Sequence, residues 1–138
     1  MWTSIRYLRL PPRRKRLLRA ALAWVILFRI GLALFSLPTL QRAISKIRTP
    51  SLAGATLDEL RWAVLAVARR VPGTRCLARS LALQALLSQA GMPATLCIGV
   101  AKQTGGALDA HAWVLHDDAP VIDEPDLARY TLLSVFAA

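Results

Sequence analysis

The 138-residue sequence has few of the residues that metal centres and disulfide frameworks require. Its two cysteines, Cys76 and Cys97, and its two histidines form neither a CxxC pair nor a Cys/His cluster at metal-ligand spacing, which argues against a zinc site. No small-residue cleavage site of a signal peptide follows an early apolar run. We therefore expect a cytoplasmic protein with two free thiols and no cofactor.

Acidic residues are also scarce, and they are missing where basic residues are concentrated. Residues 1–50 hold eleven Arg and Lys and no acid, whereas residues 51–138 hold seven basic and eight acidic residues. Such a basic segment typically binds nucleic acid, anionic lipid or an acidic polypeptide. We divide the chain into a basic, apolar, helical docking region (1–50) and a nearly neutral domain (51–138).

One apolar stretch, residues 17–38, is long enough to raise the question of a membrane span. About ten strongly apolar residues would each favour insertion by a few tenths of a kcal/mol, against roughly 3 kcal/mol for the arginine near the centre, Arg29. Insertion is therefore marginal, and basic residues on both flanks give no orientation. A buried or partner-facing helix that ends near Pro38 is favoured over a helix embedded in a membrane.

The rest of the pattern predicts helices followed by an antiparallel sheet, which is the α+β class. Thr56 and Glu59 form a capping box at the start of one helix. Thr74 is the expected N-cap of the next helix, which ends at Gly91. Three short strands are expected, over residues 94–101, 110–116 and 121–124. The C-terminal tail, residues 130–138, is expected to form either a fourth strand or a closing helix.

The helix that follows Thr74 begins with a cysteine placed as a nucleophile would be. Backbone N–H groups at a helix start favour the thiolate form of Cys76 and can bind an oxyanion, and Arg75 adds positive charge. Ser80 and Gln84 continue a polar stripe from this cysteine at i, i+4 spacing. They either support the substrate or cap a partly solvated face. The second cysteine lies in an apolar strand, where a thiol behaves as a small hydrophobe.

A thiolate nucleophile needs a base, and the base needs an orienting group. His111 lies within a strand, on one face with Trp113, and is a better base than His116 at the strand end. Three acids follow within range, and the sequence does not fix the strand register that would choose among them: Asp123, Glu124 and Asp126. The first is favoured because it ends an apolar run, where a carboxylate needs a partner.

Together these motifs resemble a known family. The segments "TRCLARSLALQALLSQAGMPATLCIGV" and "DAHAWVLHDDAPVIDE" are similar to the transglutaminase-like cysteine protease domain of lasso-peptide biosynthesis B proteins, over residues 56–130. The resemblance implies a papain- or transglutaminase-like core with Cys76 as nucleophile, His111 as base and Asp123 as orienter. Leu115 departs from the pattern, since an acid is expected after "HAWV"; any contact made by that position is in doubt.

The resemblance also implies an activity and partners. Proteins of this family remove the leader from a ribosomally made precursor peptide (a RiPP), so that a macrolactam synthetase can close the ring. The short basic N-terminus resembles the stand-alone form, in which the leader-recognition protein (the RiPP recognition element) is a separate chain. Expected partners are that protein, the lasso precursor peptide and the synthetase.

Two other functions compete with the peptidase. The same fold and thioester could serve acyl or amide transfer, or the basic region could make the chain a non-catalytic binding protein. We expect no nucleic-acid partner, because no DNA-binding motif and few exposed aromatic residues are present. Peripheral contact with a membrane stays open.

Overall fold

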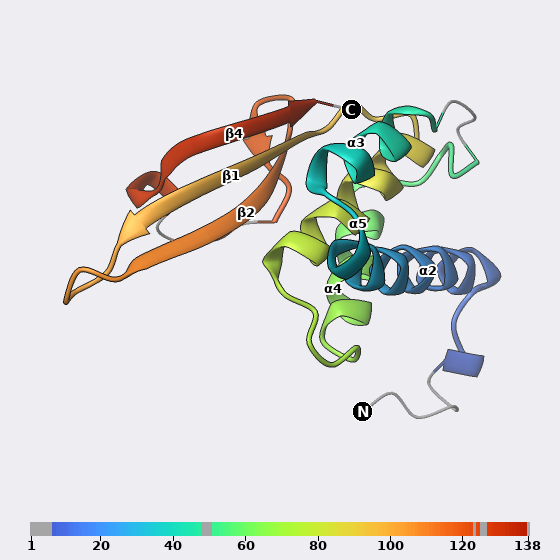
Figure 1. Cartoon of the computed structure of the whole chain (residues 1–138). Coiled ribbons are helices and arrows are strands. Elements are labelled where there is room, and N and C mark those ends of the chain that lie inside the picture. Colours follow the sequence, from blue (N-terminus) through green and yellow to red (C-terminus); the bar gives the residue numbers. More distant parts are fainter. Residues whose placement is uncertain (1–6, 48–50, 123, 125–126, 138) are drawn as a thin grey trace.

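The computed structural model describes residues 7–47, 51–122, 124 and 127–137. Within these residues, helices come first and an antiparallel sheet follows, so the expected α+β class is confirmed (Figure 1). The helices are α2 (Pro12–Leu34), α3 (Leu37–Ser45), α4 (Leu57–Ala68) and α5 (Cys76–Gln89). The strands are β1 (Thr95–Lys102), β2 (Leu108–His116), β3 (Ala119–Pro120) and β4 (Thr131–Ala137), with a short 3-10 helix, η1 (Leu127–Arg129), before β4.

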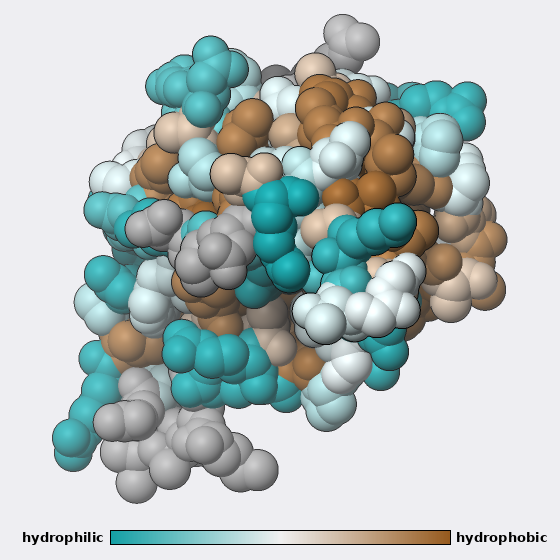
Figure 2. Space-filling view, turned by 90° about the vertical axis from the view of Figure 1, so that its left-hand side faces the viewer, coloured by the Kyte–Doolittle hydropathy of each residue, from teal (hydrophilic) through white to brown (hydrophobic). Residues whose placement is uncertain are grey.

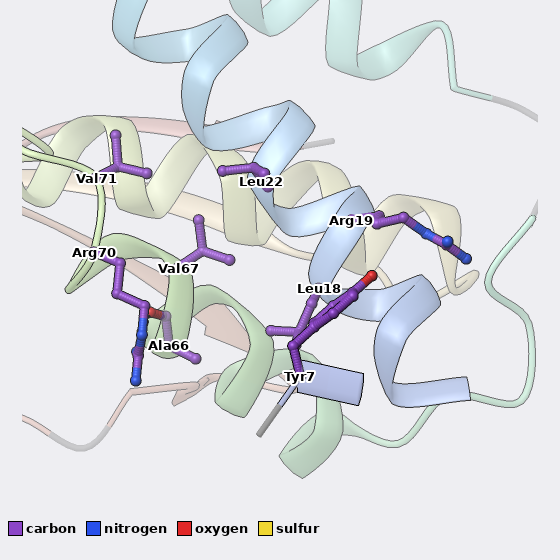
Figure 3. Close-up of a pocket in the computed structure, with 8 residues that line it drawn as sticks. All are labelled: Tyr7, Leu18, Arg19, Leu22, Ala66, Val67, Arg70 and Val71. Atoms are coloured by element: carbon purple, nitrogen blue, oxygen red, sulfur yellow. Dashed lines mark hydrogen bonds between the residues drawn. The ribbon is translucent and has the colours of Figure 1, made fainter. Parts of the chain in front are cut away.

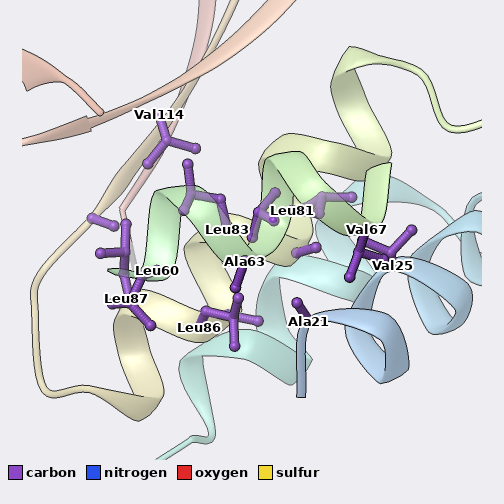
Figure 4. Close-up of a cluster of buried hydrophobic side chains, with 14 of the residues drawn as sticks. Ala21, Val25, Leu60, Ala63, Val67, Leu81, Leu83, Leu86, Leu87 and Val114 are labelled. Atoms are coloured by element: carbon purple, nitrogen blue, oxygen red, sulfur yellow. The ribbon is translucent and has the colours of Figure 1, made fainter. Parts of the chain in front are cut away.

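The sheet has the strand order β3-β2-β1-β4, and the helices cover one of its faces. Ala112 and Val114 of β2 pair with Ile98 and Leu96 of β1, and these four side chains lie in or against the hydrophobic core. Figure 4 shows Val114 directed at Leu83 and its neighbours on α5. The helix that carries Cys76 thus packs on the sheet that carries His111, as the family resemblance implies.

Helix α2 belongs to the same core as the rest of the molecule. Its buried side, which includes Leu18, Ala21, Val25 and Phe28, packs in one cluster with residues of α4 and α5. By length and composition alone α2 could cross a membrane, but a third of its most apolar window (33%) is buried inside the protein. The N-terminal region set apart by its charge therefore shares its packing with the domain that follows.

Of the two helix starts predicted from the sequence, the structure confirms one. The capping box of α4 is confirmed: Glu59 N donates to Thr56 Oγ1, and Thr56 N donates to Glu59 Oε1. This backbone hydrogen bond lowers the pKa of the Glu59 carboxyl, because it stabilises the ionised form. The predicted N-cap of α5 was wrong: Arg75 is the N-cap, and the Thr74 hydroxyl instead donates to the Val71 carbonyl.

The hairpin after β2 also differs from the prediction. Asp117 and Asp118 have φ values of 51° and 61°, in the left-handed region that a two-residue type I′ turn requires. Ala119 and Pro120 therefore pair back onto β2 as β3, and the described residues of the strand predicted over 121–124, which are 121, 122 and 124, do not form a strand. The C-terminal tail is strand β4 rather than a helix. The exposed large apolar side chains of β2 and β4 are Leu108, Leu132, Leu133 and Val135. Figure 2 shows the molecule from the sheet side, where hydrophobic and hydrophilic side chains are mixed over the surface.

Candidate functional site

Cys76 is the first residue of α5, and its side chain is half-buried. The N-cap residue, Arg75, makes no side-chain hydrogen bond to the first turn, so its side chain does not use up the backbone N–H groups there. These groups and the helix dipole favour an anion beside Cys76. The position therefore suits the oxyanion that forms when the Cys76 sulfur attacks a carbonyl.

His111 contacts a carboxylate on the segment that follows β3. Its Nε2 atom lies against Glu124 Oε2, and both side chains are largely shielded from solvent (18% exposed each). The turn explains the contact: Leu115 pairs with Pro120 across it, Val121 N donates to the Val114 carbonyl, and the same register extended to residue 124 would place it opposite residue 111. Glu124 is one of the three acids that the sequence left open. Asp123 and Asp126 lie outside the described residues, so their roles stay predictions.

Arg79 connects this pair to the helix of the cysteine. Its Nη2 atom donates to Glu124 Oε1 at 2.6 Å, so the glutamate accepts from α5 with one oxygen and contacts the histidine with the other. Cys76 and Arg79 are three residues apart and lie on neighbouring positions of one helical face. Sequence reasoning missed Arg79, although its place one turn after the cysteine could have signalled it.

The sheet face that carries His111 is the one turned away from α5. Residues paired across an antiparallel ladder share a face, and His111 pairs with Gly99 while Trp113 pairs with Cys97. The His111 ring stacks near Trp113 (centroids 6.0 Å apart) and lies 5.3 Å from the ring of Tyr130. This crowding explains the glycine, because a Cβ at position 99 would lie 2.9 Å from Trp113 Cη2.

Cys76 and His111 are not hydrogen-bonded to each other, and the Cys76 thiol makes no hydrogen bond within the part of the chain that the structure describes. The link between their two elements runs through Glu124, which contacts His111 of β2 and accepts from Arg79 in the first turn of α5. Ser80 Oγ also donates to the carbonyl of Ala112, the residue next to His111, at 3.2 Å. The first turn of α5 is thus fixed beside the middle of β2.

The second cysteine differs in its environment. Cys97 is buried (3% exposed) on the sheet face of His111, and burial raises the pKa of its thiol because the thiolate would lose its hydration. The phenol of Tyr130 donates to Asp109 Oδ2 at 2.7 Å, and this hydrogen bond raises the pKa of the tyrosine. Both groups are therefore held in their protonated forms.

The polar stripe of α5 lies inside the protein. Gln84 is fully buried, donates to the Phe136 carbonyl at 3.0 Å and accepts from Gln41 Nε2 at 2.6 Å. It also donates weakly to the Ala94 carbonyl. These bonds join α3, α5 and β4, so the structure gives this glutamine a place in the fold; a contribution of Ser80 or Gln84 to substrate binding stays a prediction.

Replacing Gln84 with leucine is expected to destabilise the fold by about 3 kcal/mol or more. The change leaves the buried Gln41 amide nitrogen without its partner and removes the bonds to the Phe136 and Ala94 carbonyls, and an unpaired buried group costs about 1–3 kcal/mol. Urea unfolding followed by circular dichroism measures the loss. Gln103→Leu in the exposed β1–β2 loop is the matched control and should leave the midpoint nearly unchanged.

His116 has a structural environment at the end of β2. Its Nδ1 atom donates to the carbonyl of Pro93 at 2.6 Å, and its Nε2 lies 3.4 Å from Asp117 in the turn. In the part of the chain that the structure describes, no three His, Cys, Asp or Glu side chains gather as a metal site would require.

In this arrangement, a helix that begins with a cysteine packs on a sheet that carries a histidine, and comparison with known proteins identifies the family. No curated protein and no solved structure matches the chain. A family model described as the transglutaminase-like superfamily matches residues 17–135, a segment that begins within α2 and ends within β4. Because this match spans most of the sequence, the chain belongs to the transglutaminase-like superfamily.

Proposed function

We propose that the protein is a cysteine peptidase that removes the leader from a ribosomally made lasso precursor peptide. The observation that carries the proposal is the order of groups in a transglutaminase-like domain: a cysteine at the first residue of a buried helix, then a histidine in contact with a carboxylate. The segments that begin at Thr74 and Asp109 supply the narrower likeness to lasso B proteins.

In the first half of the reaction, the Cys76 thiolate attacks the carbonyl carbon of the bond to be cut. Backbone N–H groups at the start of α5 stabilise the oxyanion of the tetrahedral intermediate. His111 donates a proton to the departing amine as the carbon–nitrogen bond breaks. The products are the free core peptide and a thioester between the leader and the cysteine. Arg75 and Trp113, at the helix start and beside the imidazole, are proposed to help hold the peptide.

Water completes the cycle. The neutral His111 imidazole takes a proton from water, the hydroxide adds to the thioester carbonyl, and the sulfur leaves as the thiolate. The leader departs with a free carboxylate. Catalysis requires the sulfur and the imidazole to come within hydrogen-bond reach, and hydrogen bonds of this kind tighten when substrate binds.

An orienting acid fixes the imidazole and stabilises its charged form. Two residues compete for the role. The family resemblance favours Asp123, whereas the contact with His111 and the support from Arg79 favour Glu124. We propose Glu124 on this geometry.

The proposed partners are a separate leader-recognition protein, the precursor and the macrolactam synthetase, all in the cytoplasm. The test combines the purified chain with a cognate lasso precursor and its recognition protein and follows the peptides by mass spectrometry. The proposal expects leader and core fragments whose summed mass exceeds that of the precursor by one water. An intact precursor under these conditions would overturn it.

Acyl or amide transfer is the second candidate, because membership of the transglutaminase-like superfamily supports the same thioester chemistry. Adding an amine such as methylamine to the reaction separates the two. A hydrolase should release the leader as a carboxylic acid even with the amine in excess. A transferase should instead release the leader as its amide, with the mass of methylamine replacing that of water.

A further inference from the structure

The side of α2 that faces away from the core changes character along its length. From Leu22 to the C-cap residue Phe35, the exposed residues are apolar, with Arg29 as the one charged exception. Six of them are large and expose between 42% and 70% of their surface: Leu22, Ile26, Leu27, Ile30, Leu34 and Phe35. We call these six residues the outer apolar face. So many large exposed apolar residues on one element are unusual for a monomeric soluble surface.

Helical geometry places this face opposite the core. At 3.6 residues per turn, the five members of this face that lie in α2 fall within an arc of about 140°: Leu22, Ile26, Leu27, Ile30 and Leu34. The buried residues of α2 fall on the other side. The helix therefore buries one apolar side in the protein and presents the other outward. In Figure 1, α4 and α5 lie between α2 and the sheet, so the strand that carries His111 lies away from the outer apolar face.

Arg29 lies at the border of the face rather than within it. Its guanidinium is directed at the loop between α4 and α5, since a Cβ at Gly73 would lie 2.6 Å from Arg29 Nη2. Gly73 has a φ of 78° and stands three residues before Cys76. The charge can therefore stay hydrated at the edge while the apolar residues beside it are covered.

In the sequence, exposed cations lie before and after the outer apolar face. Arg9 and Arg19 precede it, and Arg42 of α3 and Lys46 at the C-cap of α3 follow it. No acidic residue occurs anywhere in residues 1–50. An apolar helix side with basic flanks has the composition of a helix that lies in a membrane interface, and each nearby Lys or Arg strengthens attraction to anionic lipid.

An apolar groove extends the face toward α4. It has a volume of about 310 Å³ and lies between Leu18 and Leu22 of α2 on one side and Val67 of α4 and Val71 of the following loop on the other, with Arg19 also on its wall (Figure 3). Leu22 belongs both to the groove and to the outer apolar face. The groove lies away from the candidate catalytic residues, and its lining suits an acyl chain rather than a polar substrate.

We propose that α2 docks the protein on an anionic membrane surface, with the outer apolar face entering the headgroup region and the flanking cations binding lipid phosphates. The helix lies on the bilayer and does not cross it, because its inner side is committed to the core. Charge complementarity selects an anionic membrane over an ordinary protein surface. The proposal is independent of the cleavage reaction, since neither the outer apolar face nor its flanking cations include a candidate catalytic residue.

The test is co-sedimentation of the full-length protein with vesicles of phosphatidylglycerol and phosphatidylcholine, against vesicles of phosphatidylcholine alone. The anionic vesicles should bind the protein at least about tenfold more tightly. The advantage should fall as salt rises from about 0.1 M to about 1 M, which shortens the Debye length from about 10 Å to about 3 Å. Equal binding to the two vesicle types would overturn the proposal.

Two triple variants separate the outer apolar face from general surface hydrophobicity. Leu27→Gln, Ile30→Gln and Leu34→Gln together should weaken binding to anionic vesicles about tenfold or more. The control replaces three equally exposed residues of the sheet by Gln and should bind as the wild type does: Leu108, Leu132 and Leu133. Circular dichroism verifies that both variants fold, and equal loss in both variants would contradict the assignment.

Two further results would also overturn the proposal. In the first, the protein binds a purified leader-recognition protein through the outer apolar face and binds neither vesicle type, which would make the face a protein interface. In the second, bound protein resists extraction from the vesicles with alkaline carbonate, which would make α2 a membrane span.

Discussion

Replacing Cys76 with alanine is expected to reduce leader removal at least about 1,000-fold, to the uncatalysed background. The change deletes the atom that forms the thioester, and no other group at the start of α5 can take its place. The measurement is the single-turnover rate of precursor cleavage with the recognition protein present. Because the side chain is half-buried at a helix start, the variant should keep the fold and the thermal unfolding midpoint of the wild type within a few degrees.

Cys97→Ala is the matched control, and it should keep nearly full activity. The two variants test different positions for the nucleophile. Cys97 lies on the sheet face of His111, whereas Cys76 lies at the start of helix α5. Burial raises the pKa of Cys97 and keeps it a thiol, whereas Cys76 is half-buried at a helix start, where backbone N–H groups can bind an oxyanion. Loss of activity in Cys97→Ala with activity retained in Cys76→Ala would reverse the assignment.

Glu124→Gln is expected to lower the cleavage rate by about 100- to 10,000-fold, the range typical for losing an acid that orients a catalytic histidine. The amide keeps the size of the side chain but removes the charge that stabilises the imidazolium and pairs with Arg79. The value of KM should change little, because the acid acts on the histidine and not on the peptide. Steady-state kinetics over a range of precursor concentrations measures both quantities.

Asp123→Asn is the comparison that decides between neighbouring acids. If Glu124 orients the histidine, this variant should stay within about tenfold of the wild type. A large loss of activity in Asp123→Asn, with little loss in Glu124→Gln, would show that the family resemblance identified the acid correctly. The continued pairing that places residue 124 opposite His111 would then be shifted by one residue in the active protein.

Local patterns in the sequence predicted most of the elements, because short-range interactions determine them. The capping residues Thr56 and Glu59 lie three positions apart, and their hydrogen bonds form within one turn. The start of α5 was displaced by one residue, since Thr74 bonds backward to Val71 instead of forward into the helix. Such a choice depends on how the preceding loop packs and is not encoded in the cap residue alone.

Contacts between distant segments were harder to anticipate. The acid opposite His111 depends on whether Asp117 and Asp118 form a two-residue turn, and a change of one residue in that turn changes the acid. Arg79 was overlooked because its partner, Glu124, is 45 residues away. The sequence favoured a buried or partner-facing helix for this segment, but the charge pattern set it apart, and its packing in one core with α4 and α5 was not predicted.

The central claim is that Cys76 forms a thioester with the leader. The direct measurement is the intact mass of the protein after an acid quench early in the reaction with precursor and recognition protein, followed by peptide mapping of the adduct. The account predicts an increase equal to the mass of the leader acid less one water, located on the peptide that contains Cys76. An adduct that maps to Cys97 or to any other residue would contradict it.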